Sequence, residues 1–383
     1  MKNKGTKKND KCIIGGPLHL KLTKKWKNSP LNYLSLTVPF DCNFRCLKCA
    51  NSLDEQNCSD VPEIQQQMSV EKLLNYSEYE EIIGSFAASG GNTIAVIGEG
   101  EPFHPKQVNL TKHIIAIAYK NALNIIIFTN GALLNDDLIS FLYDHDVAIV
   151  FSIDSLDRDQ YTRLTGTSGK VYDAVINNIK KTTSVYQNKK SILKDTHSNE
   201  YTATYIGINS VLSLHNRSEI EKITSFLQYD VIHTFGLPLL KGGMSHRYEE
   251  FVGTDMNLLS FFDVVKEHSE TGGSISYCRS LDKCTIMNNG ILINPEGNYG
   301  VCNYSEDIKE FGNWRDNKAL LDVASSIHRR VDLFFEEQGH FFCLLRHHQA
   351  HIFFNPSDQR LSYPNEIGLA THSIDEIAQT NQI

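Results

Sequence analysis

The chain has 383 residues and a formal net charge of −8 at pH 7, which argues against a general nucleic-acid binder because phosphate binding needs clustered Lys and Arg. Its 41% of hydrophobic residues can bury a sizeable core, but no apolar run reaches the roughly 18 residues of a membrane span. The basic residues 1–8 are followed by no apolar segment, so we expect no signal peptide, no membrane contact and a cytoplasmic protein.

Short apolar runs alternate with amphipathic segments along most of the chain. After a polar lead-in at residues 1–30, six predicted strands lie within residues 31–245: Tyr33–Val38, Thr93–Ile97, Asn124–Phe128, Val147–Ile153, Thr204–Val211 and Val231–Leu237. The predicted helices are Tyr79–Ala88, Leu110–Ala122, Asp136–Tyr143, Val171–Thr182, Ile220–Leu227 and Leu258–His268. This α/β alternation predicts a partial (βα)6 TIM-like barrel, with its chemistry at the C-terminal ends of the strands.

The pattern changes in the last third of the chain. Residues 246–350 are predicted to hold a linker helix and a small C-terminal extension of a β-hairpin and a helix. The hairpin is predicted from two apolar runs, Gly290–Asn294 and Tyr299–Asn303, around a turn that contains Pro295 and Gly297. Residues 351–383 are predicted to be a polar tail.

Nine cysteines in a chain without a secretion signal indicate metal or redox chemistry rather than disulfides. Three of them, Cys42, Cys46 and Cys49, have the spacing C-x3-C-x2-C directly after the first predicted strand. Three closely spaced thiolates can bind three irons of a 4Fe–4S cluster and leave the fourth iron open for a ligand. Structural zinc is the alternative, although it would need a fourth nearby Cys or His.

This spacing, on a loop after the first strand, resembles the radical S-adenosylmethionine (SAM) superfamily. The resemblance implies that the open iron binds SAM and that an electron cleaves SAM to a 5′-deoxyadenosyl radical, which removes a hydrogen atom from the substrate. The family usually has an aromatic residue before the last cysteine, where it packs on the adenine. Here that residue is Lys48, so the adenine contact is an open question.

Further motifs follow the next strands in the order that the resemblance requires. Residues 98–102, Gly-Glu-Gly-Glu-Pro, resemble the family's Gly-Gly-Glu-Pro motif, in which glycine permits close backbone approach and an oxygen accepts from the SAM ammonium. Strand alternation puts Ser152 and Asp154 on the same face, where they could hydrogen-bond the ribose hydroxyls. Arg163 could pair with the SAM carboxylate, or could instead be a solvated helix charge. The resemblance assigns the ends of the next two strands, at Asn209 and Leu237, to SAM contacts. All the candidate SAM contacts are Gly98, Gly100, Glu101, Pro102, Asn130, Ser152, Asp154, Arg163, Asn209 and Leu237.

A second cysteine group lies around the predicted hairpin and comprises Cys278, Cys284, Cys302 and Cys343. It resembles the SPASM/twitch extension of radical SAM enzymes, which carries auxiliary 4Fe–4S clusters. Four ligands imply one auxiliary cluster, as in the shorter twitch version. Zinc bound by the same four thiolates is the alternative. His347 and His348 are either spare ligands or surface residues.

Two cysteines, Cys12 and Cys58, remain outside both groups. Lone cysteines are commonly small buried hydrophobes. As an alternative, Cys58 is a candidate thiol donor of a hydrogen atom, the role that such a residue has in radical epimerases.

The function that we expect is oxidation, by dehydrogenation, of a small polar metabolite, with the auxiliary cluster accepting the substrate electron. The alternative is a peptide maturase that crosslinks, oxidises or epimerises a ribosomal peptide, although the 41 residues before Cys42 leave no room for an attached leader-binding domain of about 80 residues. A third reading is a non-catalytic zinc-binding protein. The expected partners are the substrate and an electron donor such as flavodoxin or ferredoxin.

Overall fold

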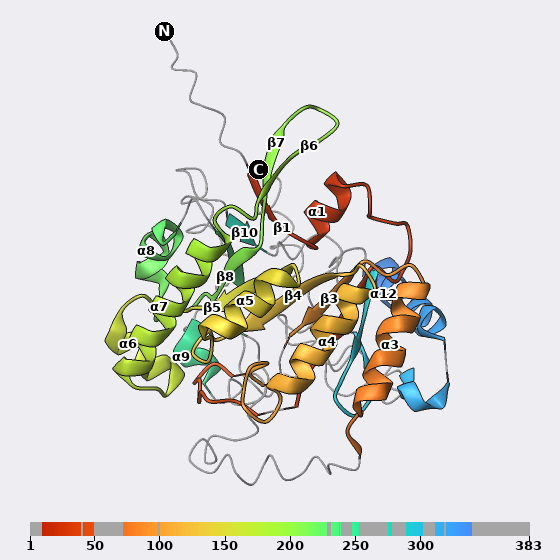
Figure 1. Cartoon of the computed structure of the whole chain (residues 1–383), viewed down its shortest axis with the longest axis horizontal. Helices are drawn as coiled ribbons and strands as arrows, with labels where there is room; N and C mark the ends of the chain where they lie inside the picture. Colours follow the sequence, from red (N-terminus) through yellow and green to blue (C-terminus); the bar gives the residue numbers. More distant parts are fainter. Residues whose placement is uncertain are drawn as a thin grey trace.

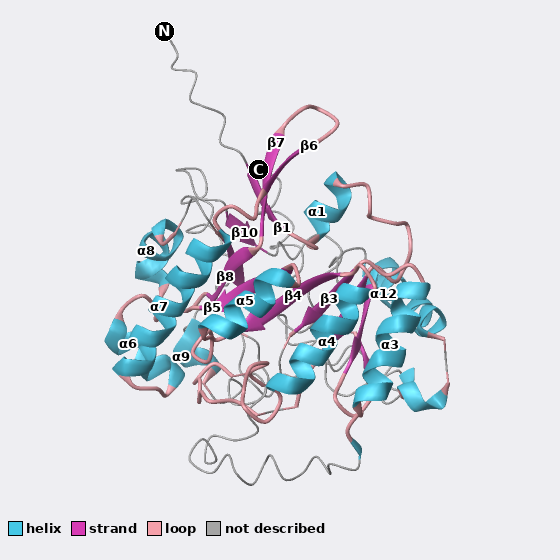
Figure 2. Ribbon diagram, viewed as in Figure 1, coloured by secondary structure: helices cyan, strands magenta, loops and turns pink. Residues whose placement is uncertain are grey.

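The computed structural model describes residues 10–39, 41–49, 72–97, 100–227, 231–236, 238, 247–252, 275–277, 289–301, 311–317 and 319–338. Most of these residues belong to a parallel sheet with helices packed on it (Figures 1 and 2). The sheet has nine strands in the order β10-β9-β8-β5-β4-β3-β2-β11-β12, and each neighbouring pair except β11–β12 is parallel.

All six predicted strands are present in this sheet. They are β2 (Tyr33–Leu36), β3 (Thr93–Val96), β4 (Asn124–Thr129), β5 (Val147–Ser152), β8 (Ile206–Val211) and β9 (Ile232–Gly236). Their parallel arrangement agrees with the predicted α/β class and with a partial TIM-like barrel. Two further parallel strands, β10 (Ile275–Tyr277) and β11 (Gly290–Ile293), lengthen the sheet beyond the prediction.

Some of the helices that connect these strands begin at a side-chain cap. In α3 (Tyr76–Ala88), Asn75 and Glu78 form a reciprocal capping box, and Asn135 caps α5 (Asp136–Asp144). The other helices are α1 (Pro17–Leu22), α4 (Val108–Lys120), α6 (Arg158–Thr165), α7 (Gly169–Tyr186), α8 (Ile220–Ser225), α9 (Tyr248–Val252) and α12 (Leu320–Gln338). The sequence did not predict α6. The predicted helix Leu258–His268 lies outside the described residues.

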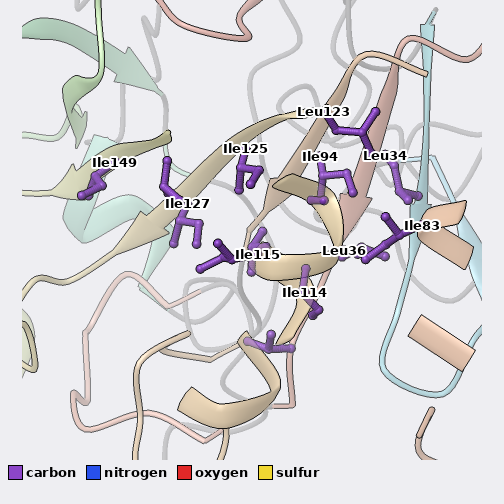
Figure 3. Packing of buried hydrophobic residues seen from close by; sticks show 14 of the residues in the cluster. Leu34, Leu36, Ile83, Ile94, Ile114, Ile115, Leu123, Ile125, Ile127 and Ile149 are labelled. Atoms are coloured by element: carbon purple, nitrogen blue, oxygen red, sulfur yellow. The ribbon is translucent and has the colours of Figure 1, made fainter. Parts of the chain in front are cut away.

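The core forms where strand side chains from one face of the sheet meet the helices. Leu34, Ile94 and Ile125 are register partners on β2, β3 and β4, and each is at most 1% exposed. Figure 3 shows these residues beside Ile114 and Ile115 of α4. Burying a side chain of this size stabilises the fold by about 1.5–3 kcal/mol. These contacts are therefore the main interaction that keeps the helices packed on the sheet.

A smaller sheet joins the N-terminal segment to a hairpin that precedes β8. Its order is β1-β7-β6, with β1 (Asp10–Ile13) parallel to β7 (Glu200–Thr204) and β7 antiparallel to β6 (Ser191–Lys194). Part of the expected lead-in is therefore a strand and a helix, because β1 pairs with residues about 190 positions later, which no local pattern reveals. Cys12 of β1 is 2% exposed in an apolar cluster, as a buried hydrophobe would be.

Residues 10–16 also close the end of the large sheet at which β2, β3 and β4 begin. The carbonyl of Gly15 accepts hydrogen bonds from the hydroxyls of Tyr33 (2.9 Å) and Thr93 (2.8 Å), the first residues of β2 and β3. Beside them, Asn92 donates to the Asn32 side chain at 2.8 Å. We call this neutral, hydrogen-bonded region the closed end of the sheet.

The predicted hairpin is confirmed as β11 and β12 (Tyr299–Gly300), but it is not separate from the barrel sheet. β11 lies parallel to β2, with Ile291 beside Leu34. The apolar run of β11 is buried on the sheet and lies against α12. No helix among the described residues has the length and apolar character needed to span a bilayer.

Candidate functional site

The loop that carries Cys42, Cys46 and Cys49 follows β2 at the C-terminal end of the sheet. In Figure 1 this red-orange loop lies at the end of the sheet opposite the β6–β7 hairpin. The backbone N–H groups of Arg45 and Leu47 donate to the carbonyls of Thr165 (3.0 Å) and Leu164 (2.9 Å), the last residues of α6. The cysteine loop is therefore held by the end of a helix that the sequence did not predict.

Gly166 makes this approach possible. It ends α6 in the left-handed conformation with φ +63°, and a Cβ atom here would lie 2.8 Å from the Arg45 carbonyl oxygen. Glycine tolerates both the positive φ and the close contact. The chain therefore meets the cysteine loop without strain at this point.

The three cysteines are in the reduced thiol form, and each is partly buried. Burial raises the pKa of Cys42 to about 12, and burial followed by the neighbouring Cys42 and Cys49 also raises the pKa of Cys46. Both thiols are therefore protonated at neutral pH without a metal. Metal binding would release these protons, as metal sites that use thiolates require.

A second anchor comes from the loop after β3. A Cβ atom on Gly100 would lie 2.4 Å from the Pro39 carbonyl oxygen and 2.6 Å from that of Asp41, so only glycine fits this contact. The Glu101 N–H donates to the Asp41 carbonyl at 2.9 Å, and the Gln107 side chain donates to the same oxygen at 3.1 Å. Gly100, Glu101 and Gln107 thus support the backbone directly before Cys42.

The Glu101 carboxylate is buried and connects three neighbouring groups. Its Oε1 accepts from the Thr129 hydroxyl (2.6 Å) and the Phe103 N–H (3.2 Å), and its Oε2 accepts from the Asn130 N–H (2.8 Å). Burial raises its pKa to about 7, although these donors favour the charged form. Both oxygens therefore already have donors from the protein, which fits a support for the loops better than the expected acceptor for the SAM ammonium.

Asn130 and Pro102 also lie beside the cysteine loop. Asn130 donates from Nδ2 to the Asn43 side chain at 2.9 Å and accepts from the Ala132 N–H through Oδ1 at 3.0 Å. The Pro102 carbonyl accepts from the Thr111 hydroxyl at 2.6 Å, which fixes the start of α4. The predicted residues after β3 and β4 are thus brought together with the loop.

Ser152 and Asn209 are register partners at the ends of β5 and β8, and the Thr234 hydroxyl donates to Asn209 Oδ1 at 3.0 Å. Asp154 lies just beyond β5, and each of its carboxylate oxygens has a partner in the protein. Its Oδ1 accepts from the Val211 N–H at 2.9 Å, and its Oδ2 forms an ion pair with Lys48. Asp154 is therefore fixed at the end of β5, and its expected contact with the ribose stays a prediction.

The half-exposed Arg163 side chain lies beside His215 and Glu250. Its guanidinium contacts His215 Nδ1 at 2.9 Å and lies 3.9 Å from a Glu250 oxygen, and its side chain is 50% exposed. Burial and Arg163 lower the pKa of His215, so this histidine is neutral at pH 7. Arg163 is therefore engaged with His215 and Glu250, and its expected contact with the SAM carboxylate stays a prediction.

Two residues that sequence reasoning missed also shape this end of the sheet. Glu219 accepts from the Ser155 hydroxyl (2.6 Å) and from the N–H groups of Leu156 (2.8 Å) and Asp157 (3.0 Å), which orders the turn into α6. Tyr161 packs edge-on against Phe44 of the cysteine loop and is 1% exposed. Neither residue lies in a recognisable motif, because each acts across a long sequence separation.

Several candidates lie outside the described residues. They are Gly98, Leu237, Cys58, the four cysteines Cys278, Cys284, Cys302 and Cys343, and His347 and His348. Their roles stay predictions.

The donor set after β2 fits an iron–sulfur cluster. Within the described ranges, no three His, Cys, Asp or Glu side chains converge as the ligands of one metal ion. A 4Fe–4S cluster takes one thiolate on each of three irons, so its ligands stand further apart than those of a single ion. Three partly buried thiols in one anchored loop meet that requirement.

Comparison with known proteins identifies the domain that contains this loop. Residues 36–193 match the family model of the radical SAM superfamily. A GTP 3′,8-cyclase of Clostridium botulinum (strain Langeland) is 24% identical over 304 residues, which cover 76% of this chain and 87% of that enzyme. A GTP 3′,8-cyclase of Pseudomonas fluorescens is 32% identical over 142 residues, but these cover only 37% of this chain and 38% of that enzyme.

Solved structures show the same fold at low identity. SuiB of Streptococcus suis bound to S-adenosylmethionine has a TM-score of 0.56 at 15% identity, covering 81% of this chain and 70% of SuiB. The enzyme anSMEcpe with bound AdoMet has a TM-score of 0.53 at 14% identity, covering 84% of each chain. These likenesses support the predicted α/β architecture.

Proposed function

We propose that this chain, whose residues 36–193 match the radical SAM superfamily, is a radical SAM enzyme and that Cys42, Cys46 and Cys49 hold the 4Fe–4S cluster that binds SAM. The observation that carries the proposal is the cysteine loop itself, which is fixed by α6 and Gly100 at the C-terminal end of the sheet. In parallel α/β barrels this end is where catalytic groups gather.

The cofactors of this family, a 4Fe–4S cluster and SAM, supply a radical that removes a hydrogen atom from the substrate. The residues of the chain position the loops that would surround these cofactors. Glu101 fixes the loops after β3 and β4, and Asn130 ties them to Asn43 between the first two cysteines. Ser152 and Asn209 present polar groups at neighbouring strand ends, where a polar ligand would be oriented.

For the substrate we propose a small polar metabolite, and a guanosine nucleotide as the first compound to test. The support is the alignment to a GTP 3′,8-cyclase, which extends over three quarters of this chain. Ring closure and dehydrogenation both begin with loss of a hydrogen atom from a carbon. Dehydrogenation assisted by an auxiliary cluster on Cys278, Cys284, Cys302 and Cys343 remains the second outcome that we propose to test.

The test uses protein reconstituted anaerobically with iron and sulfide, then reduced and mixed with SAM and GTP. We expect 5′-deoxyadenosine and a GTP-derived product that is absent with the Cys46→Ala variant. Mass spectrometry separates the outcomes, because a cyclised isomer keeps the substrate mass and a dehydrogenated product is lighter by two hydrogens. A wild-type protein that forms no 5′-deoxyadenosine under any substrate condition would contradict the proposal.

Peptide maturation is the other class to test. Its basis is the fold of SuiB, one of whose structures is described as bound to its precursor peptide SuiA. Product formed from a peptide but not from nucleotides would favour it. Deuterium from heavy water at the reacting carbon, lost in a Cys58→Ala variant, would indicate epimerisation with Cys58 as hydrogen donor.

A further inference from the structure

The segment between the second and third cysteines carries a cation that is paired inside the protein. The Lys48 ammonium contacts the Asp154 carboxylate, and the two side chains are only 17% and 7% exposed. The exposed ion pairs of this chain differ from it, since Arg158 and Asp173 are each more than half exposed. A pair at this depth is screened far less by water and salt than a surface pair.

Asp154 is held rigidly from its other side. Its second carboxylate oxygen accepts from the Val211 N–H at 2.9 Å, and its carbonyl accepts from the Asn216 side chain at 2.8 Å. Lys48 therefore meets a fixed anion at the end of β5.

Lys48 itself lies within a tight turn between Cys46 and Cys49. The Cys49 N–H donates to the Cys46 carbonyl at 3.1 Å, and the Leu47 N–H is bound to α6. The lysine is therefore flanked by two thiol ligands in a turn with little freedom to move.

We propose that Lys48 is a positioning residue whose ammonium, held in place by Asp154, keeps a positive charge beside the Cys46–Cys49 turn and thereby raises the reduction potential of the cluster that these cysteines hold. This inference rests on the proposed function. A fixed cation beside a thiolate ligand favours the more negatively charged, reduced cluster. The ion pair also joins the cysteine turn to the C-terminal end of β5.

The experiment measures the midpoint potential of the reconstituted cluster by an EPR-monitored redox titration. It follows the signal that the Cys46→Ala variant removes, so a second cluster does not interfere. We expect a lower potential in Lys48→Met, because Asp154 is left uncompensated, and a higher potential in Asp154→Asn, because Lys48 is left uncompensated. Lys48→Arg keeps the charge and should restore a value near that of the wild type.

Two further variants separate this role from a structural one. The double variant Lys48→Met/Asp154→Asn removes both charges without leaving one buried alone, so it stays informative if a single variant does not fold. Its potential should lie between those of the two single variants. Lys106→Met breaks the pair with Asp41 next to the same loop, but Lys106 is 62% exposed, so we expect a much smaller shift.

Potentials that do not move, or that move in the same direction in both single variants, would overturn the inference and leave the proposed function intact. A wild-type protein without any cluster signal that Cys46→Ala removes would instead refute the proposed function, and this inference with it. Shifts of opposite sign, with Lys48→Arg close to the wild type, would establish Lys48 as the residue that sets the potential.

Discussion

The two ends of the parallel sheet are built from different chemistry. At the closed end, neutral groups meet: the Gly15 carbonyl accepts from Tyr33 and Thr93, and Asn92 donates to Asn32. At the opposite end, buried Glu101 and the Lys48–Asp154 pair stand beside three cysteines. Burying charge costs free energy even when it is paired, so its concentration at one end marks that end as the place of function.

The largest expected effect is the difference in SAM cleavage between a cysteine variant at the C-terminal end of the sheet and one at the closed end. Cys46→Ala should abolish SAM cleavage, because one iron loses its ligand, whereas Cys12→Ala at the closed end should leave cleavage within a few-fold of wild type. The formation of 5′-deoxyadenosine by each reconstituted variant checks this. Equal losses in both variants would show that the effect is structural and would remove the distinction between the ends.

The Glu101→Ala variant tests the support of the loops. It leaves the Thr129 hydroxyl and the N–H groups of Phe103 and Asn130 without their acceptor, so we expect a loss of about 3 kcal/mol in the free energy of unfolding and a large loss of SAM cleavage. Urea unfolding and 5′-deoxyadenosine assays measure the two effects. The exposed Glu80→Ala on α3 is the matched control and should change stability by less than about 0.5 kcal/mol.

The pH dependence of stability should have opposite signs at the two ends. Burial lowers the pKa of His233, near the start of β9, to about 4, so its contribution is present above pH 6.5 and is lost as the pH falls through 4. The pKa of Glu101 is raised to about 7, so its contribution is present below pH 4.5 and is lost as the pH rises through 7.

Between pH 5 and 8 each group should change the free energy of unfolding by about 2 kcal/mol, so the wild-type profile is shallow because the two changes oppose each other. His233→Gln should reveal the fall with rising pH, and Glu101→Gln should reveal the fall with acid. Urea unfolding at matched iron content measures both profiles. Profiles of both variants that parallel the wild type would refute the assignment of these two groups.

The smallest expected effect is at the closed end. Tyr33→Phe removes one of the two donors to the Gly15 carbonyl and should cost about 1 kcal/mol without altering SAM cleavage. Thermal unfolding and the cleavage assay together test this. A loss of cleavage larger than the loss of stability would mean that the closed end also shapes the site.

Local sequence determined the elements and the metal-binding motif. The six predicted strands are present because runs such as Asn124–Thr129 combine β-branched residues with burial of most of their side chains. The cysteine spacing, Gly100 and Asn130 were recognisable because each depends on residues close to it in the chain. Their order on successive strand ends predicted that they would lie together at the C-terminal end of the sheet.

Only the tertiary structure decided which of these groups are already paired. Lys48 meets Asp154 across 106 positions, Glu219 orders the turn at Ser155 across 64, and β1 pairs with β7 across about 190. It also decided that β11 extends the barrel sheet beside β2. Such contacts depend on where the folded sheet places distant side chains, and the free energy that selects them is released only when the whole core is buried.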